Sequence, residues 1–368
     1  MGWKLSDLEK VKKNGLKVFS CFSCGGGSTM GYKMAGYDVI GGNEIDKRMA
    51  ELYRLNHNPK YFYTEDVRDF VKRTDLPEEL YDLDILDGSP PCAPFSMAGH
   101  REDTWGKQKK FAEGQKYQIL DDLFFEFIKV ADKLKPKVVV AENVEGLIKG
   151  AARGYVNEII KGFNAAGYEV QMFLLDASKM GVPQKRRRVF FICRLKSLGW
   201  PQIIMEFNEK PITFGEVRSK TGRENNEYAI SVLKYKIPSD TDFADIKMRI
   251  SSINSDFSRK ILWDDCPTQT LNTYTQAFIR ACDDMQVSIH DMIAIATFPE
   301  DFNFGAKNIH TKTAFLTGMS VPPIMMERIA TQIYRQWFEP QAETEQGMAS
   351  NNRKPKRSRA LSEGCING

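Results

Sequence analysis

The feature that most limits the fold of this chain is a regular alternation, between residues 16 and 195, of short apolar runs and segments with helical periodicity. The clearest helical segment is 117–136, where apolar residues recur three and four positions apart. Parallel strands need a helical crossover, so this alternation predicts an α/β fold: a mostly parallel, Rossmann-like sheet with helices on both faces. The expected strands are 16–22, 37–44, 60–67, 82–88, 137–144, 168–177 and 187–195.

The pattern weakens after residue 195, which divides the chain into four expected parts. We predict a large domain at 1–195, a smaller polar unit at 196–311, a helix at 312–340 that returns to the large domain, and a polar basic tail at 341–368. A length of 368 residues suits one large or two ordinary domains. The tail is expected to be a solvated end, and weak contact with nucleic acid is the alternative.

Composition indicates a cytoplasmic protein. No apolar run approaches the ~18 residues of a membrane span, and no secretory signal is evident at the start. The seven cysteines have no paired spacings typical of a disulfide framework. Cys21 and Cys24 have the spacing of a zinc pair, but no second pair exists, so no metal site is predicted. The net charge of +4 permits an anionic partner without requiring one.

A glycine-rich turn follows the first expected strand. In open α/β sheets ligands bind beyond the carboxyl ends of the strands, and glycines let the backbone approach them. Gly25, Gly26 and Gly27 occupy this turn, and Glu44, about 20 residues on, could accept hydrogen bonds from ribose hydroxyls. Asp66 follows the third strand and could bind an adenine amino group. The turn therefore indicates an adenosine-type cofactor, with an ordinary strand-to-helix turn as the alternative.

A cysteine stands directly after two prolines at the end of the fourth expected strand. Proline fixes φ, so Pro90 and Pro91 would hold the thiol of Cys92 firmly on the ligand side of the sheet. A reactive cysteine must be partly exposed, whereas an inert one is buried. Cys92 is thus a candidate nucleophile, and a small buried hydrophobe in a proline turn is the alternative.

Polar residues at two further strand ends would join this thiol. Glu142 ends the strand that follows Cys92, and Gln184, Arg186 and Arg188 lie at the mouth of a later strand. A carboxyl, a thiol and a guanidinium at one sheet edge form a plausible site for an electron-poor ring. The alternative for the arginines is a solvated or phosphate-binding basic run.

These segments resemble motifs of the DNA (cytosine-5)-methyltransferases, enzymes that use S-adenosylmethionine. The resemblance spans roughly 16–340 and rests on "NEID", "GSPPCAPFS", "ENV", "QKRRR" and "FPEDF" in the family's order, with "TGMSVPP" as a looser match. It implies transfer of a methyl group to C5 of a flipped-out cytosine in a specific duplex DNA sequence, through a covalent bond between Cys92 and C6.

The resemblance also implies roles for single residues. Cys92 would be the nucleophile, Glu142 would bind N3 and the exocyclic amine, Arg188 would contact O2, and Arg186 would orient the loop. The residues implied in cofactor binding are Phe22, Gly25, Gly26, Gly27, Glu44 at the ribose, Ile45 on the adenine face, Asp66 at adenine, and Pro91. Ordinary core packing is the alternative for Phe22 and Ile45.

DNA contacts are expected from a loop and from the smaller unit. The segment that follows Cys92 has little apolar periodicity and is predicted to be a loop that closes over DNA. The unit after residue 196 would read bases in the major groove. The DNA-binding candidates are Arg101, Lys107, Lys220, Arg223 and Thr270, with Lys234 and Lys236 as further basic residues. Double-stranded DNA is the expected partner of a monomer, and a cognate restriction endonuclease could accompany it.

Four positions depart from the family pattern. Cys24 replaces a glycine, Ala93 a glutamine and Met319 an asparagine, while His290 stands where an arginine is expected. Two other functions stay open: a tRNA cytosine-5 methyltransferase on the same scaffold, and a non-catalytic protein that binds DNA or the cofactor. The length of the region after 196 favours DNA over tRNA, and the intact Cys92 with its carboxyl and guanidinium partners favours an enzyme.

Overall fold

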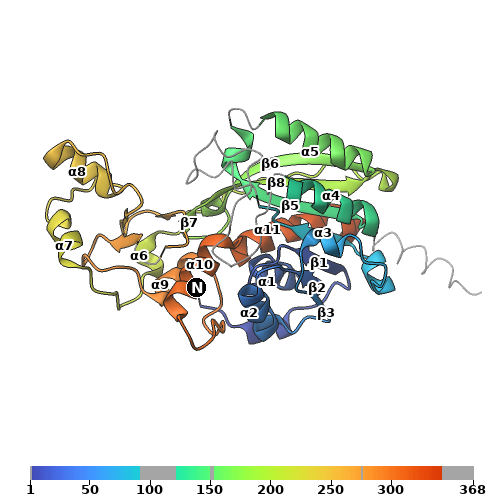
Figure 1. Cartoon of the computed structure of the whole chain (residues 1–368), viewed down its shortest axis with the longest axis horizontal. Coiled ribbons are helices and arrows are strands. Elements are labelled where there is room, and N and C mark those ends of the chain that lie inside the picture. The colour runs from blue at the N-terminus through green and yellow to red at the C-terminus, as the bar shows by residue number, and fades with distance from the viewer. Residues whose placement is uncertain (1, 92–121, 150–152, 275–276, 342–368) are drawn as a thin grey trace, which may run out of the picture.

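The centre of the protein is a seven-stranded sheet, in the right-hand body of Figure 1, where its strands follow one another from β6 at the top to β3 at the bottom. The computed structural model describes residues 2–91, 122–149, 153–274 and 277–341. The strand order is β3-β2-β1-β4-β5-β8-β6, and every neighbouring pair is parallel except those of β8, which runs antiparallel to β5 and β6. The strands are β1 (Lys17–Cys21), β2 (Asp38–Asn43), β3 (Tyr61–Tyr63), β4 (Ile85–Gly88), β5 (Val138–Val144), β6 (Tyr168–Asp176) and β8 (Arg187–Leu195). All seven lie within predicted strands, so the expected fold class is confirmed.

Helices cover both faces of this sheet because successive strand residues point to opposite sides. Phe19 on β1 packs under one layer of helices, and its neighbour Val18 packs under the other. The first layer is α3 (Val67–Phe70), α4 (Leu123–Leu134) and α5 (Arg153–Ala165). The second is α1 (Gly27–Met34) with α11 (Pro323–Ile333) and the π-helical turn Tyr334–Phe338. Residues 323–338 therefore cover one face of a sheet whose strands lie between residues 17 and 195.

Helix α4 illustrates how sequence sets these elements. Its apolar residues recur on one face, and Phe124 and Phe127 are fully buried against the sheet, each stabilising the fold by about 1.5–3 kcal/mol. The helix ends at Lys135, which has a left-handed φ of 49°, and Pro136 follows it and cannot continue the helix. The first five residues of the predicted helix at 117–136 lie outside the described part of the chain.

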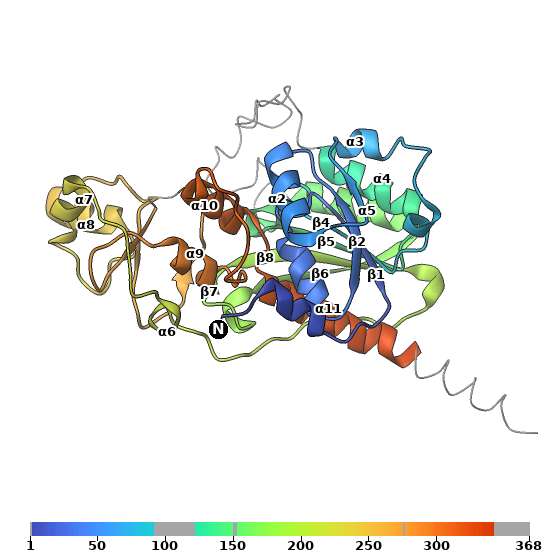
Figure 2. The same cartoon turned by 90° about the horizontal axis from the view of Figure 1, so that it is seen from below.

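A smaller unit extends from this body, on the left of Figures 1 and 2. Two small apolar clusters hold it together: one joins α7 and α8 through Leu233 and Phe243, and the other joins Phe278 and Leu316 to Met30 of the body. Its elements are α6 (Phe214–Val217), α7 (Glu227–Leu233), α8 (Phe243–Ser251), β9 (Lys260–Leu262), β10 (Thr268–Gln269), β11 (Phe278–Arg280), α9 (Ile289–Ile295) and α10 (Ile309–Met319).

Short elements complete the described chain. They are α2 (Lys47–His57), β7 (Gln184–Lys185) and the 3₁₀ turns Leu5–Lys10, Glu78–Tyr81, Glu145–Ile148, Ala177–Lys179 and Lys196–Leu198. Among the helices of the described ranges, none combines the length and the apolar character needed to cross a bilayer.

Candidate active site

One edge of the sheet collects the polar residues predicted to form the site. The parallel strands β1, β2, β4 and β5 all end at this edge. Strand β8 runs in the opposite direction, so its first residues come to the same edge, with Arg188 paired in register with Val144. The antiparallel strand therefore brings the arginine segment to the carboxyl ends of its neighbours, as the predicted site requires.

A carboxylate and a guanidinium form an ion pair at this edge. Arg188 Nε lies 3.0 Å from Glu142 Oε1, and both side chains are largely buried. Burial lowers the pKa of Arg188, and the charge of Glu142 partly offsets this effect. The pair offers an acceptor and a donor side by side, which is the arrangement that a heterocycle with an amine and a carbonyl oxygen needs.

Arg186 has a different environment from Arg188. It is fully buried, and two of its guanidinium nitrogens donate to the carbonyl of Gly318, each at 3.1 Å. That carbonyl belongs to the last turn of α10, where backbone oxygens lack helical partners and cations are favoured. Burial lowers the pKa of Arg186, but an arginine pKa starts so high that the group stays charged. Arg186 therefore joins the sheet edge to α10.

Gln184 joins the two parts of the protein, a role that sequence reasoning did not give it. Its side chain accepts a hydrogen bond from the amide of Leu271 at 3.1 Å and donates to the carbonyl of Ile295 at 3.4 Å. Strand β7 also pairs with β10, and the hydroxyl of Thr270 donates to the carbonyl of Lys185 at 2.7 Å. The proximity of "PTQTL" to "QKRRR" had no local sequence signal, because these segments lie more than 80 residues apart.

The glycine turn is built for close packing. Gly26 has a φ of +92°, which favours glycine, and a Cβ there would lie 2.1 Å from His57 Nε2. That nitrogen is 3.1 Å from the carbonyl of Gly25, so His57 supports the turn from α2. Burial lowers the pKa of His57 to about 3, so the imidazole is neutral.

Glu44 lies beneath this turn as a nearly buried carboxylate. One of its oxygens accepts a hydrogen bond from the amide of Cys24 and the other from the amide of Asp46, both at 2.8 Å. Burial raises the pKa of Glu44 to about 7, although these backbone donors oppose the shift. A carboxylate oxygen can accept more than one hydrogen bond, so this acceptor group fits the two hydroxyls of a ribose.

The other predicted cofactor residues lie around the same edge, with differing surroundings. Phe22 is half-buried, has a φ of +53° and meets the ring of Phe127 edge-on. Asp66 caps α3 by accepting from the amide of Arg68 at 2.9 Å and also forms an ion pair with that side chain. Ile45 and Pro91 are half-buried.

Three predicted residues lie outside the described part of the chain: Cys92, Arg101 and Lys107. The described range stops at Pro91, directly before Cys92. One residue earlier, the carbonyl of Pro90 accepts a hydrogen bond from the Asn143 side-chain amide at 3.0 Å. Asn143 thereby holds the proline turn against β5, beside Glu142. Ala93, where the family resemblance predicts glutamine, is likewise outside the described residues.

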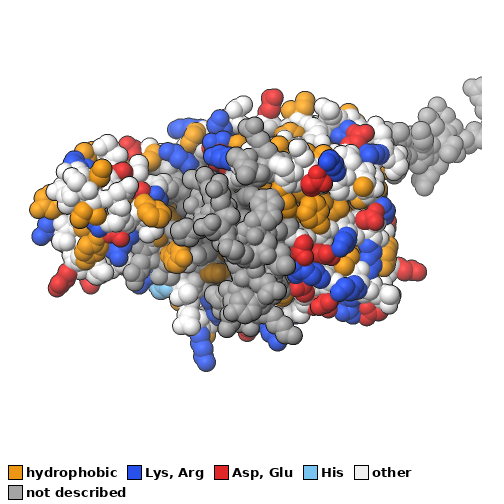
Figure 3. Space-filling view, turned by 45° about the horizontal axis from the view of Figure 1, so that its top comes forward, with side chains coloured by type: hydrophobic (Ala, Val, Ile, Leu, Met, Phe, Trp, Pro, Cys, Tyr) orange, Lys and Arg blue, Asp and Glu red, His pale blue; other side chains and the backbone are white. Residues whose placement is uncertain are grey.

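Several cations of the smaller unit are held in ion pairs within that unit. Lys236, Lys247 and Arg249 form ion pairs with carboxylates of the same unit. Of the DNA-binding candidates, Lys220 is exposed, and Arg223 is half-buried with its backbone paired to Gln286. The surface of this unit also exposes apolar side chains, which include Tyr228, Ile230, Tyr235, Met248 and Phe257. Orange apolar groups are visible on this unit at the left of Figure 3.

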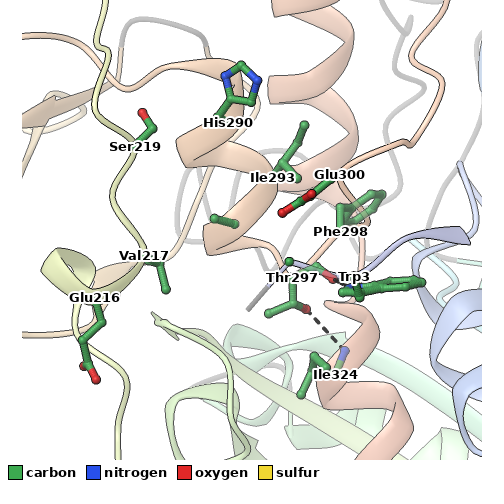
Figure 4. Close-up of a pocket in the computed structure, with 12 residues that line it drawn as sticks. Trp3, Glu216, Val217, Ser219, His290, Ile293, Thr297, Phe298, Glu300 and Ile324 are labelled. Atoms are coloured by element: carbon green, nitrogen blue, oxygen red, sulfur yellow. Dashed lines mark hydrogen bonds between the residues drawn. The ribbon is translucent and has the colours of Figure 1, made fainter. Parts of the chain in front are cut away.

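A separate cavity of about 600 Å³ lies on α9, beside the N-terminal segment (Figure 4). The indole nitrogen of Trp3 donates to the carbonyl of Thr297 at 3.0 Å, which ties that segment to the cavity wall. His290, one of the departures from the family pattern, lines this cavity. Of the predicted catalytic and cofactor residues that the structure describes, none contributes to its lining.

Two further features are the lack of a metal-binding group among the described residues and the position of Met319. Within the described ranges, no group of three or more His, Cys, Asp or Glu side chains is arranged to hold a metal ion. Met319, another departure, is exposed at the end of α10, directly after the carbonyl that binds Arg186.

Comparison with known proteins gives one family. The family model for C-5 cytosine-specific DNA methylase matches residues 16–335. Type II methyltransferase M.NgoPII of Neisseria gonorrhoeae is 34% identical over 185 residues, covering 50% of this chain and 50% of that protein. Type II methyltransferase M1.HphI of Haemophilus parahaemolyticus is 26% identical over 335 residues, covering 87% of each. This chain thus aligns with about half the length of M.NgoPII, and with most of M1.HphI.

Solved structures share the fold. An Escherichia coli prophage protein, described as a candidate DNA modification methyltransferase, superposes with a TM-score of 0.62 at 21% identity, covering 88% of this chain and 99% of that one. A DNMT2 variant of Spodoptera frugiperda gives a TM-score of 0.57 at 16% identity, covering 87% of this chain and 100% of that one. At such identities the likeness concerns the architecture alone.

Proposed function

The chain belongs to the C-5 cytosine-specific DNA methylase family, and from that premise we propose that it transfers a methyl group from S-adenosylmethionine to C5 of a cytosine in a specific duplex DNA sequence. The observation that carries this proposal is the ion pair of Glu142 and Arg188 at the strand edge. It lies beside the proline turn that leads to Cys92. Few other chemistries need these three groups together.

The cofactor would lie along the glycine turn. When bound, S-adenosylmethionine supplies an electrophilic methyl group. The carboxylate of Glu44 would accept both ribose hydroxyls, because a carboxylate oxygen can accept more than one hydrogen bond. Phe22 and Ile45 would pack against the adenine ring, Asp66 would accept from its amine, and Pro91 would border the methyl donor.

The target base would be activated by addition of a thiolate. C5 of cytosine is a weak nucleophile, so we propose that the Cys92 thiolate bonds to C6 while Glu142, protonated once the base is bound, gives its proton to N3. The addition gives an enamine with its double bond between C4 and C5, and C5 would take the methyl group as the methyl–sulfur bond of the cofactor breaks and leaves its electron pair on that sulfur. A base then removes the C5 proton, the C6–sulfur bond breaks to release the thiolate, and N3 returns its proton to Glu142. Arg188 would donate to O2 and favour the thiolate electrostatically.

Arg186 would support the same reaction indirectly, by holding other parts of the site in place. Its two hydrogen bonds to Gly318 hold α10 at the sheet edge, which keeps Arg188 next to Glu142. It does not need to touch the base for this role.

Duplex DNA would bind between the body and the smaller unit, with the target cytosine flipped out to reach the sheet edge. Lys220, Arg223, Arg101 and Lys107 are the proposed contacts to the DNA. Thr270 would contribute through its link to Lys185, which joins the recognition unit to the arginine segment. We further propose a cytoplasmic monomer. Because several relatives are named Type II methyltransferases, we propose that a cognate restriction endonuclease can accompany it.

Trapping the covalent bond tests this proposal. The protein is incubated with methyl-labelled S-adenosylmethionine and duplex DNA that contains 5-fluorocytosine, whose fluorine cannot leave as a proton does. We expect a denaturant-stable protein–DNA adduct that Cys92→Ser abolishes. Cys282→Ser, which alters an exposed thiol of the smaller unit, is the matched control and should form the adduct normally. Labelling of tRNA with no adduct on any DNA would overturn the proposal.

A further inference from the structure

A second buried carboxyl group lies close to the proposed site and has no part in the chemistry above. Asp87 is the third residue of β4 and lies five positions before Cys92. Its side chain is 3% exposed, and no ion pair with a Lys, Arg or His is found for it among the described residues. A buried carboxylate without a cation is costly, so such a group normally has a specific reason to persist.

Asp87 joins three elements of the fold. One of its oxygens is 2.7 Å from the hydroxyl of Ser20 on β1, and the other is 3.3 Å from the hydroxyl of Tyr32 on α1. The strand β1 and the helix α1 flank the glycine turn proposed for the cofactor. The strand β4 continues into Pro90 and Pro91. The carboxyl thus ties the floor of the cofactor site to the segment that carries the nucleophile.

Asp87 also shares a sheet face with Glu142. In the register of β4 and β5, Asp87 is paired with Val140, and Glu142 follows two residues later on the same face. Two carboxyl groups in one low-dielectric region oppose each other's ionisation. The polar or titratable groups that contact Asp87 or interact with it electrostatically are Ser20, Cys21, Tyr32, Tyr53 and Glu142.

We propose that Asp87 is a positioning residue that acts in its neutral, protonated form. The neutral carboxyl can donate to one hydroxyl and accept from the other, so it satisfies Ser20 and Tyr32 without placing a charge beneath the site. Loss of its proton adds a negative charge beside Glu142, in the strand that leads to Cys92, and a negative charge there disfavours the thiolate. Methyl transfer should then fall at alkaline pH. This inference rests on the proposed function.

The direction of the titration agrees with the geometry. Burial, and to a lesser extent the charge of Glu142, raises the pKa of Asp87 to about 7, while the hydroxyls of Ser20 and Tyr32 oppose the shift. Removing a hydroxyl should therefore move the ionisation to still higher pH. Replacing the carboxyl by an amide of the same shape should remove the ionisation altogether.

Single-turnover methyl transfer, measured from pH 6 to 9 with saturating cofactor and DNA, tests the proposal. We expect the rate of Asp87→Asn relative to wild type to rise about 15-fold between pH 7 and pH 8.5, because the amide has no proton to lose. Tyr32→Phe should move the alkaline decline of the wild type to higher pH. Asp82→Asn, which changes an exposed carboxylate before the same strand, is the control and should reproduce the wild-type profile.

A purely structural role would lower the rates of Asp87→Asn and Tyr32→Phe equally at every pH, and that result would overturn the proposal. Thermal unfolding gives a readout that does not depend on catalysis. A carboxyl with a raised folded pKa loses its stabilising contribution as pH rises from about 4 to about 7. The Tm of Asp87→Asn minus the Tm of the wild type should therefore increase as pH rises over this range. A constant difference would also refute the inference, whereas absence of methyl transfer to any DNA would refute the proposed function.

Discussion

Cofactor affinity should depend on pH through Glu44. The carboxyl is nearly buried, and its pKa is raised to about 7 because burial outweighs its two backbone hydrogen bonds. Only the ionised form can accept from both ribose hydroxyls while keeping those bonds. With a pKa of about 7, roughly 9% of the group is ionised at pH 6 and roughly 91% at pH 8. Affinity should thus rise about tenfold between these values, or about 1.4 kcal/mol.

The ligand for this measurement should not itself titrate in the range. 5′-Methylthioadenosine keeps the adenosine but lacks the amino acid group, so its charge is constant from pH 6 to 8. Isothermal titration calorimetry should give a tenfold change in Kd for wild type and a nearly flat, weaker Kd for Glu44→Gln. Asp38→Asn, at the exposed start of the same strand, is the matched control and should keep the wild-type slope.

Two results would refute this reasoning. A flat wild-type affinity would mean that Glu44 does not change charge in this range. A slope that persists in Glu44→Gln would assign the titration to another group, of which the buried Asp87 is the nearest in pKa.

Three further predictions concern catalysis and stability. Glu142→Gln should lower the single-turnover rate by about 100-fold or more while leaving 5′-methylthioadenosine binding intact, because only the proton transfer to the base is lost; an unchanged rate would contradict the role of Glu142. Gly26→Ala should destabilise the fold by about 1–3 kcal/mol in urea denaturation, because its Cβ would overlap His57 and its φ is positive; equal midpoints would refute the argument. Arg280→Met should cost about 3–5 kcal/mol, since it leaves Asp291 charged and fully buried, and a loss below 1 kcal/mol would show that this ion pair adds little.

Much of the fold followed from local pattern. Apolar runs such as 137–144, alternating with helical segments, determined the strands because buried parallel strands need continuous apolar residues. The glycine turn and the proline turn were evident for the same reason, since backbone geometry restricts which residues can occupy them. The order of the motifs was enough to indicate the family, which the match over residues 16–335 confirmed.

The tertiary structure decided which of the polar residues meet. The sequence placed Arg186 and Arg188 at one strand mouth, but Arg186 lies in the link between β7 and β8 and donates to Gly318, whereas Arg188 lies inside β8 and pairs with Glu142. The link between Gln184 and Leu271 depends on pairing across more than 80 residues, which no local pattern encodes.

Asp87 shows the same contrast between sequence pattern and tertiary structure at a single residue. In the sequence it is an ordinary Asp-Gly at the end of an apolar run, a pair typical of turns. Its burial, its two hydroxyl partners and its place beside Glu142 arise only when β1, β4, β5 and α1 pack together. Sequence alone thus determined the elements and the chemistry they carry, because both depend on neighbouring residues. The environment of each charge was decided by the tertiary structure, because burial depends on residues far away in the chain.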